Sequence, residues 1–423
     1  MNNSQSISPA TEVTPAQMEH NFRLGVINGV LYIFAEALLD PTLVLVAFLS
    51  YLTDSPFLLG LVIPIRDGAW SLPQFFISGW VQNHPLKIEI YKSMSYVRIA
   101  AWVILALSIN LVHDPDWLLV AFFIAYLIAA LASGVGGLPF MEVVSKTVPP
   151  RRRGELYAWR LGLGGLLGIA ASGLVRWMVS PQAPMGFPYN FGLLSIGYFV
   201  VGSIALLLYN GVKEQPDEYL PPRRTIRQQL TKALEILPGN SNYRLLLWTQ
   251  TLMTIANSAT PFFAVYVQRE FQGPQEWVGI YLAVLMGSNL ISNLVLGRLS
   301  RLVDNQRVMQ VAAGAGTLMS VGVVLLAMFG KAWGISSQAA SICLLPVFFL
   351  SGVRGTGFGV SSPSLMMNIA PDEDRTLVIG LTQTLLGVVL LLTSLGGVVY
   401  DVFGFLTLAV ITLGAHLGAW IMV

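Results

Sequence analysis

The chain has 423 residues, of which 54% are hydrophobic and only 11% are charged, and its mean hydropathy is +0.66. A soluble protein carries about 25% charged residues, so this composition excludes a soluble globular enzyme and predicts a protein with many membrane spans. The net charge of +2 does not identify a partner, and the single cysteine, Cys343, excludes an intramolecular disulfide.

Residues 1–20 contain no apolar segment, so we expect a disordered tail and no cleavable signal peptide. Twelve apolar runs follow, separated by charged residues, Pro and Gly, and each is long enough to supply the roughly 20 helical residues that cross a bilayer. The predicted spans are 24–50, 56–82, 93–112, 117–145, 156–179, 189–212, 244–267, 277–300, 307–330, 338–369, 376–400 and 403–422.

The predicted fold is therefore an all-α membrane protein of twelve transmembrane helices. The longest loop, 213–243, divides the chain into a first bundle of six helices over 21–212 and a second over 244–423. The two halves share features about 220 residues apart, which indicates an internal duplication and pseudo-symmetric halves. The matched features are Asp40-Pro41 with Thr260-Pro261, Gly79 with Gly297, Pro139 with Pro363, and Arg153 with Arg375.

Basic residues predict the orientation, because loops rich in Lys and Arg stay in the cytoplasm. If the N-terminus is inside, sixteen loop Lys and Arg residues face the cytoplasm, and only Arg176, Arg269 and Lys331 face outside. We therefore expect both termini to be cytoplasmic, and we expect a bacterial plasma (inner) membrane because the loops are short.

The loop after the second span begins with a glycine and ends with a lysine: Gly79-Trp80-Val81-Gln82-Asn83-His84-Pro85-Leu86-Lys87. Together with the twelve spans and the central loop, it resembles the major facilitator superfamily, whose loop reads Gly-x-x-x-Asp-Arg-x-Gly-Arg-Lys. Asn83 and His84 stand where that family has Asp and Arg, and the second copy, which begins at Gly297, has Arg301 at the acidic position. The resemblance covers nearly the whole chain. It implies a transporter fold with a central cavity lined by spans 1, 4, 7 and 10, and an inner gate at these loops.

We assign the inner gate to Gly79, Asn83, Lys87, Glu142, Arg160, Gly297 and Arg301. Glu142 and Arg160 lie near the inner ends of spans 4 and 5. They could form a gate clasp, with Arg98 as another partner for Glu142, or pair locally at the membrane surface.

Charged residues inside predicted spans are candidates for function, because each costs roughly 2.5–3.5 kcal/mol to insert. Glu36 and Asp40 are four residues apart in span 1 and therefore share one helix face. Since Pro41 weakens the local backbone hydrogen bonding, we expect this face to line a wet cavity and to exchange a proton. The alternative is a permanent ion pair with an arginine.

Arg354 in span 10 stays charged, so it could pair with Asp40 or Glu36 across the halves or bind an anionic substrate group. Arg66 and Asp67 in span 2 could contribute to the cavity or form a structural network. Asn257 belongs to a polar stripe of span 7 that suits either substrate binding or helix packing.

These residues predict a secondary transporter that works by alternating access. We favour proton-coupled efflux of small amphipathic compounds by an antiporter. Two alternatives remain: proton-linked uptake of a polar or anionic solute, and a lipid translocator or a membrane scaffold or sensor that transports nothing. We expect the protein to bind a small-molecule substrate, to use protons as the coupling ion, to reside in the lipid bilayer and to be a monomer. We expect no enzyme activity, no cofactor, no metal site and no nucleic-acid partner, because no motif for any of these is present.

Overall fold

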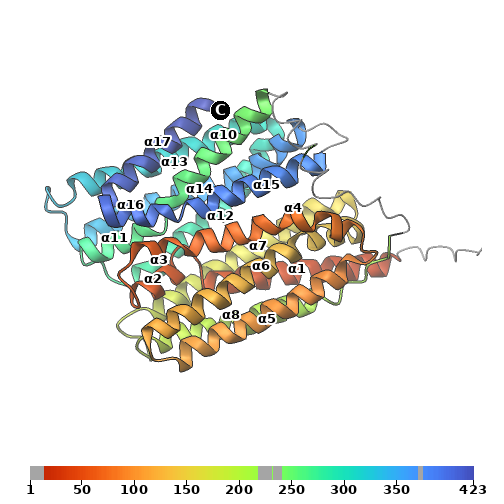
Figure 1. Cartoon of the computed structure of the whole chain (residues 1–423), viewed down its shortest axis with the longest axis horizontal. Helices are drawn as coiled ribbons and strands as arrows, with labels where there is room; N and C mark the ends of the chain where they lie inside the picture. Colours follow the sequence, from red (N-terminus) through yellow and green to blue (C-terminus); the bar gives the residue numbers. More distant parts are fainter. Residues whose placement is uncertain (1–13, 218–230, 232–240, 370–374) are drawn as a thin grey trace, which may run out of the picture.

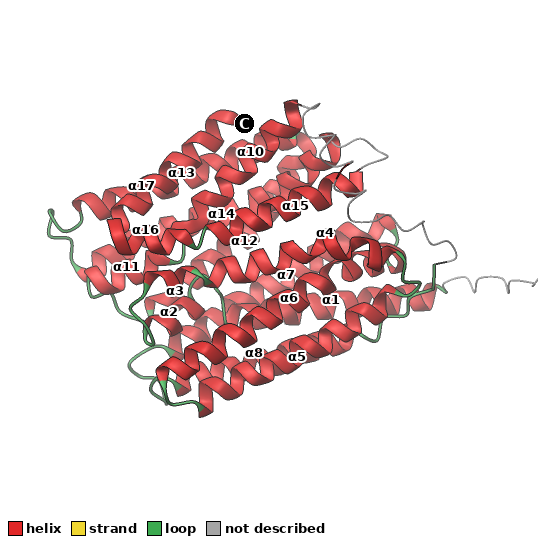
Figure 2. Ribbon diagram, viewed as in Figure 1, coloured by secondary structure: helices red, strands yellow, loops and turns green. Residues whose placement is uncertain are grey.

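The computed structural model describes residues 14–217, 231, 241–369 and 375–423. Helices and short connections make up this described part, which contains no strand (Figure 2). The first half holds α1 (Pro15–Leu38), α2 (Val44–Ser50), α3 (Pro56–Gly60), η1 (Pro64–Gly68), α4 (Ala69–Gln82), α5 (Lys87–Leu111), α6 (Pro115–Thr147), α7 (Pro150–Met178) and α8 (Tyr189–Tyr209). The second half holds α10 (Ser241–Ile255), η2 (Ala256–Ala259), α11 (Phe262–Glu270), α12 (Trp277–Leu302), α13 (Asn305–Phe329), α14 (Ser337–Ile369), α15 (Arg375–Leu392), α16 (Leu395–Phe403) and α17 (Phe405–Met422).

Nine helical segments of the described residues are long and apolar enough to cross a membrane. They comprise α5, α6, α7, α8, α12, α13, α14, the segment Val378–Phe403 in α15 and α16, and α17. The prediction of an all-α membrane protein is confirmed. The count of twelve spans stays a prediction.

The other three predicted spans, 24–50, 56–82 and 244–267, are interrupted near prolines. α1 ends before Pro41, η1 is one turn of π-helix that begins at Pro64, and the 3₁₀ turn η2 ends before Pro261. Proline has no N–H to donate and clashes with the preceding turn, so it favours a break at each position. The candidate residues Glu36 and Asp40, Arg66 and Asp67, and Asn257 lie at or next to these breaks.

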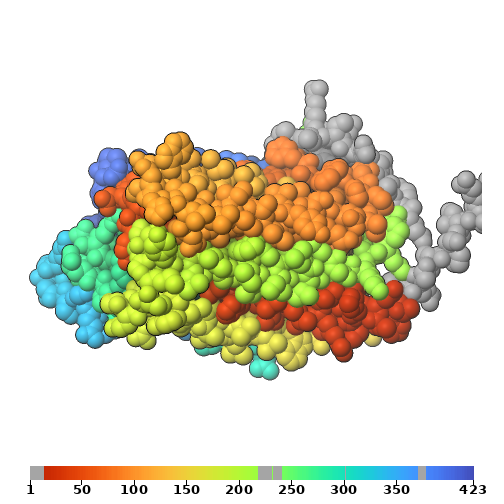
Figure 3. Space-filling view, turned by 90° about the horizontal axis from the view of Figure 1, so that it is seen from below, coloured from red at the N-terminus to blue at the C-terminus, as the bar shows by residue number. Residues whose placement is uncertain are grey.

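The two halves form adjoining bundles, with the first below the second in Figure 1. Corresponding helices pack alike: α5 with α6 and α13 with α14, α4 with α6 and α12 with α14, α1 with α8 and α10 with α17. This correspondence agrees with the predicted duplication. Figure 3 shows α5, α8 and α1 side by side along one face of the first half.

One end of the molecule carries most of the described basic loop residues, and we call it the basic end. There α1 and α5 begin and α8 and α17 finish, with Lys87, Lys146, Arg152 and Arg307 close to helix termini. α1 begins at Pro15, capped by Thr14, and so starts before the boundary expected at residue 21. Of the predicted central loop, residues 218–230 and 232–240 lie outside the described part of the chain.

The halves touch along α7 with α12 and α4 with α15, and at the opposite end along α3 with α16 and α2 with α11. The approach of α16 to α3 requires Gly397, because a Cβ there would lie 2.4 Å from the Pro56 carbonyl oxygen. Arg269 of α11 spans the same end. It donates to the Thr53 carbonyl (3.3 Å), the Asp54 carbonyl (3.2 Å) and the Asp54 carboxylate (3.2 Å). The opposite end is therefore closed by backbone packing and a polar clasp.

Candidate functional site

One face of α1 carries Asn28, Tyr32, Glu36 and, just beyond the helix end, Asp40, each four residues after the last. Side chains at this spacing stack on one side of a helix. An arginine from a different element reaches each of the first three. These three contacts and the Asp40 turn form the centre of the candidate site.

A cavity of about 390 Å³ opens along this face, which is within the range of small-molecule sites. All of the residues that line it belong to the first half, and they come from α1, the turn after α1, α2, η1, α4, α5, α6, α7 and α8. Its charged residues are Glu36, Arg66, Asp67, Arg98 and Arg160, and its aromatic residues are Tyr32, Trp70, Tyr91, Trp102, Tyr126, Phe140 and Tyr198. The cavity therefore combines an apolar aromatic wall with a few converging charges.

The central pair is Glu36 with Arg66. Arg66 Nη2 lies 2.9 Å from Glu36 Oε2, and the Tyr198 hydroxyl donates to Glu36 Oε1 at 3.0 Å. The side chains of Arg66 and Glu36 keep 45% and 22% of their surface exposed, so the pair is reachable from the cavity. Asp67 is a weaker second partner, 3.9 Å from Arg66 Nε. In this conformation Glu36 is therefore paired with an arginine, Arg66.

Asp40 lies behind the cavity wall and is only 8% exposed. Its Oδ1 accepts hydrogen bonds from the backbone N–H groups of Thr42 (3.0 Å) and Leu43 (2.9 Å), where the chain turns into α2. These N–H groups have no earlier turn of α2 to bond to, so the carboxylate acts as a cap. The residues that meet the cavity here are its neighbours Leu39 and Pro41.

Arg98 of α5 and Arg160 of α7 contact the next two positions on this face of α1, Tyr32 and Asn28. Arg98 Nη2 donates to the Tyr32 hydroxyl at 2.7 Å, and its guanidinium lies 5.0 Å from the Trp102 ring centroid. Arg160 Nη1 donates to the Gly25 carbonyl (2.7 Å) and to Asn28 Oδ1 (3.1 Å). Among the described residues, no carboxylate lies within 4 Å of either guanidinium. The cavity therefore contains two arginines that no carboxylate of the described residues neutralises by direct pairing.

Arg98 was predicted only as a possible gate partner, and Tyr32 and Tyr198 were not predicted as site residues. Two signals pointed to the first two of these residues. Arg98 falls inside the predicted span 93–112, where any charge is a candidate, and Tyr32 lies four residues before Glu36. Tyr198 had no comparable signal in the sequence.

Asn257 and Arg354 meet in the second half and do not line this cavity. Arg354 Nη2 donates to Asn257 Oδ1 at 2.8 Å, and the Thr260 hydroxyl donates to the same oxygen at 2.9 Å. Within the described chain Arg354 makes no ion pair, so the suggested contacts with Asp40 and Glu36 across the halves are not formed in this conformation. The Arg354 Nε is buried and has no hydrogen-bond partner among the described residues.

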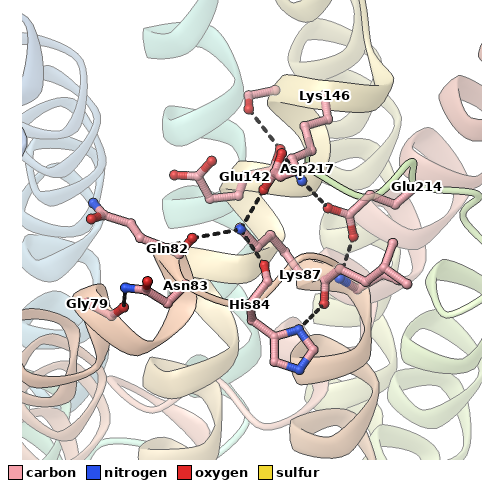
Figure 4. Close-up of polar contacts among 12 residues, drawn as sticks. Gly79, Gln82, Asn83, His84, Lys87, Glu142, Lys146, Glu214 and Asp217 are labelled. Atoms are coloured by element: carbon pink, nitrogen blue, oxygen red, sulfur yellow. Dashed lines mark hydrogen bonds and ion pairs between the residues drawn. The ribbon is translucent and has the colours of Figure 1, made fainter. Parts of the chain in front are cut away.

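At the basic end, two lysines of the first half form an ionic cluster with carboxylates that follow α8 (Figure 4). Lys87, whose side chain is 3% exposed, pairs with Asp217 at 2.6 Å and donates to the carbonyls of Gln82 and His84. Lys146 pairs with both Glu214 and Asp217 at 2.7 Å. Residues that follow α8 therefore supply the carboxylates that the 79–87 loop lacks.

The same contacts stabilise Asp217 in its charged form. Burial alone would raise the pKa of Asp217, but hydrogen bonds from Lys146 and Lys87 outweigh it, so the pKa of this carboxyl is lowered from its ordinary value of 3.8. Glu214 also accepts a 2.6 Å hydrogen bond from the Ile88 N–H near the start of α5. The cluster thus joins α5, α6 and the segment after α8.

The remaining gate residues are separate from this cluster. Asn83 donates to the Gly79 carbonyl at 2.7 Å, and in Figure 4 the Glu142 carboxylate points away from the lysines. In the described part of the chain Glu142 forms no ion pair with Arg160, Arg98 or Lys146. Gly297 lies in α12, as does Arg301, whose side chain is outside the described part. No group of three metal-binding side chains occurs among the described residues.

The chain matches one protein-family profile and is similar in fold to several solved structures. A profile of the Major Facilitator Superfamily matches residues 25–394. The structure is similar to that of a mutant of the nucleoside transporter NupG, with a TM-score of 0.72, 14% identity, and coverage of 95% of this chain and 98% of that one. It is also similar to a D-xylose-proton symporter (TM-score 0.66, 14% identity, 96% and 98% coverage).

A third similar structure is a bacterial homologue of the iron transporter ferroportin in its outward-facing state (TM-score 0.61, 16% identity, 96% and 98% coverage). A search of curated protein sequences finds no match. At these identities the structural likeness concerns the fold alone.

Proposed function

The chain belongs to the Major Facilitator Superfamily, and we propose that it is a twelve-span secondary transporter that moves a small organic solute by alternating access. Members of this family are transporters and not enzymes, they bind small molecules, and they reside in a lipid bilayer. The three interrupted helical segments support the count of twelve, because the consecutive pieces of each segment cover one predicted apolar run. Broken backbone inside a membrane is tolerated where it lines a cavity.

The observation that carries the proposal is the exposed Glu36–Arg66 pair inside the cavity. Arginine stays charged, so a proton that binds Glu36 would leave Arg66 without its strongest partner. Loading and release of that proton would change the charge that a solute meets in the cavity. We therefore place proton coupling first at Glu36, with Asp40 as a second candidate behind the wall.

We propose efflux of small amphipathic compounds as the first form of this activity. The aromatic wall formed by Trp70, Trp102 and Tyr126 supports it, because aromatic rings bind planar apolar groups in many orientations. The second form is uptake of an anionic solute, which the unneutralised Arg98 and Arg160 favour. Both forms use the same cavity, and they differ in direction and in the class of solute.

The conformation that fits this structure is inward-facing. The clasp of Arg269 on Thr53 and Asp54 and the packing of α16 on α3 close the opposite end. The basic end would be cytoplasmic by the distribution of Lys and Arg, in a bacterial inner membrane, with both termini inside and the protein a monomer.

The deciding experiment is solute flux in proteoliposomes under an imposed pH gradient, preceded by a thermal-shift screen of solutes at two pH values. A solute that stabilises the protein is then loaded inside or outside the vesicles. Flux driven by the gradient supports the transporter, and its direction separates efflux from uptake. If no solute moves but labelled lipids exchange between leaflets, the protein is a lipid translocator; if neither moves, it is a scaffold or sensor.

The matched variants are Glu36→Gln and Glu89→Gln. Glu89 pairs with Lys92 on the surface of α5, with 52% of its side chain exposed, so it controls for loss of one carboxylate. Glu36→Gln should remove the response to the pH gradient, and Glu89→Gln should keep it. Gradient-driven flux that is unchanged in Glu36→Gln and lost in Asp40→Asn would move the coupling site to Asp40.

A further inference from the structure

The three arginines that reach α1 are not in equivalent environments. Arg66 meets a carboxylate, whereas the partners of Arg98 and Arg160 among the described residues are neutral: a tyrosine hydroxyl, an amide oxygen and a backbone carbonyl. An uncompensated charge away from bulk water is costly, so a buried arginine is usually paired with a carboxylate or binds an anionic ligand. The cavity is lined by three arginines and two carboxylates, Glu36 and Asp67, which leaves one positive charge.

We propose that Arg98 and Arg160 form a subsite for the single negative charge of the transported solute, the carboxylate of a small amphipathic acid. The proposal rests on the proposed transport function and adds to it the chemical class of the substrate. One anionic group would balance the net charge of the cavity lining.

The surroundings of Arg98 support a role in anion binding. The residue is 8% exposed, lines the cavity, and its Nε is buried without a hydrogen-bond partner in the described chain. The rings of Tyr32 and Trp102 lie 5.2 Å and 5.0 Å from its guanidinium carbon. Contacts with these rings hold the guanidinium in place, so little side-chain freedom is lost when an anion binds.

Arg160 is held in the same manner. Its guanidinium lies 5.0 Å from the Phe140 ring centroid and donates to α1 at Gly25 and Asn28. Gly29 leaves the space for it, since a Cβ at this position would lie 2.3 Å from Arg160 Nε. A planar guanidinium that is fixed in this way presents its N–H groups in the geometry that suits a carboxylate.

The two arginines contact successive turns of α1. Their partners on α1, Asn28 and Tyr32, are four residues apart on one face, which corresponds to a rise of about 6 Å. Arg98 and Arg160 both line the cavity, as do Tyr91, Trp102 and Phe140. An acid with an apolar or aromatic body would thus find its charge and its body complemented by one wall.

The test is binding to the purified full-length protein in detergent, which does not depend on transport. The probes are benzoate, benzenesulfonate and phenylphosphonate, with benzamide as the neutral match for benzoate and benzylamine as the cation. Millimolar benzoate should raise the melting temperature of the wild type, and benzamide and benzylamine should not. Stabilisation by phenylphosphonate but not by benzoate would overturn the carboxylate assignment and indicate a dianionic group.

The variants are Arg98→Gln, Arg160→Gln and Gly29→Ala, with Arg23→Gln as the control on an exposed arginine. Loss of a charge-assisted hydrogen bond should weaken benzoate binding about tenfold or more in each arginine variant. Gly29→Ala should weaken it without removal of a charge, because the new methyl group displaces Arg160. Lysine at either position should restore part of the affinity, and Arg23→Gln should bind as the wild type does.

Equal benzoate affinity in the wild type and both arginine variants would overturn the proposal, as would failure of every anion to stabilise the wild type. The two proposals fail separately. Binding that depends on the arginines without any flux would retain the subsite and reject transport. Flux of a solute that ignores both arginines would retain transport and reject the subsite.

Discussion

Arg66 and Glu36 come from two different interrupted spans and meet at 2.9 Å inside the cavity of the first half. Each is next to a break in its helix, where the backbone does not continue as a regular α-helix. Both side chains are partly exposed, so protons and solutes in the cavity can reach the pair. This relationship leads to the first prediction.

Glu36→Gln should change coupling more than stability. The pair is partly exposed, so its loss should alter the free energy of unfolding by no more than about 1 kcal/mol. The amide keeps the size of the side chain and can still accept from Tyr198. Chemical denaturation of wild type and variant, together with flux at several pH values, tests both parts. A large loss of stability with unchanged pH dependence would assign the pair a purely structural role.

For a substitution at Asp40 we expect the reverse, a larger effect on stability than on coupling. Its carboxylate caps two backbone N–H groups from a buried position, so Asp40→Ala should destabilise the protein by about 1–3 kcal/mol. Asp40→Asn retains an oxygen acceptor and should lose much less. If Asp40→Asn also keeps normal pH-dependent flux, the residue is a cap and not a second coupling site. Equal destabilisation by Ala and Asn would mean that its charge is essential to the cap.

The clasp at the opposite end should depend on Arg269 and hardly on the Asp54 carboxylate. The Asp54 side chain is fully exposed, with a relative accessibility of 103%, so water screens its ion pair. Two of the three Arg269 contacts go instead to the carbonyls of Thr53 and Asp54. We therefore expect Arg269→Ala to open this end, and Asp54→Asn to have little effect.

Spin labels on α2 and α11 would measure the opening as a shift in the distance distribution toward longer values. Cys343 is exposed and must be replaced by serine before labelling. An equal shift in Asp54→Asn and Arg269→Ala would show that the carboxylate holds the clasp after all.

The lysine cluster predicts a pH dependence of stability. The pKa of Asp217 is lowered in the folded protein, so the unfolded state takes up a proton at a higher pH than the folded state does. The stabilisation from Asp217 is therefore fully present above its ordinary pKa of 3.8 and is lost as the pH falls through the lower folded value. Wild type should be more stable than Asp217→Asn at pH 5–8, and the difference should shrink below about pH 4.

Melting curves of the two proteins across this pH range test the cluster. Asp304→Asn is a suitable control, because Asp304 caps α13 at the surface and lies away from the lysines. A stability difference that stays constant down to about pH 3 would contradict a lowered pKa at Asp217.

The sequence by itself determined the membrane class, the helical fold and the weak point of the first span at Pro41, whereas the breaks near Pro64 and Pro261 were not predicted. Long apolar runs, rare charges and prolines are local features, and a helix in a membrane forms from local hydrogen bonds alone. Glu36, Asp40, Arg66 and Arg354 were recognisable for the same reason, since a charge inside an apolar run is visible without a structure.

Only the tertiary structure decided which charge meets which partner. Arg66 is thirty residues from Glu36, Lys87 is 130 residues from Asp217, and Arg354 pairs with Asn257 and not with the carboxylates of α1. Such contacts depend on how whole helices pack, and several equally polar partners are possible for each arginine until that packing exists. The same packing left Arg98 and Arg160 without a carboxylate among the described residues, and no local pattern in the chain encodes that absence.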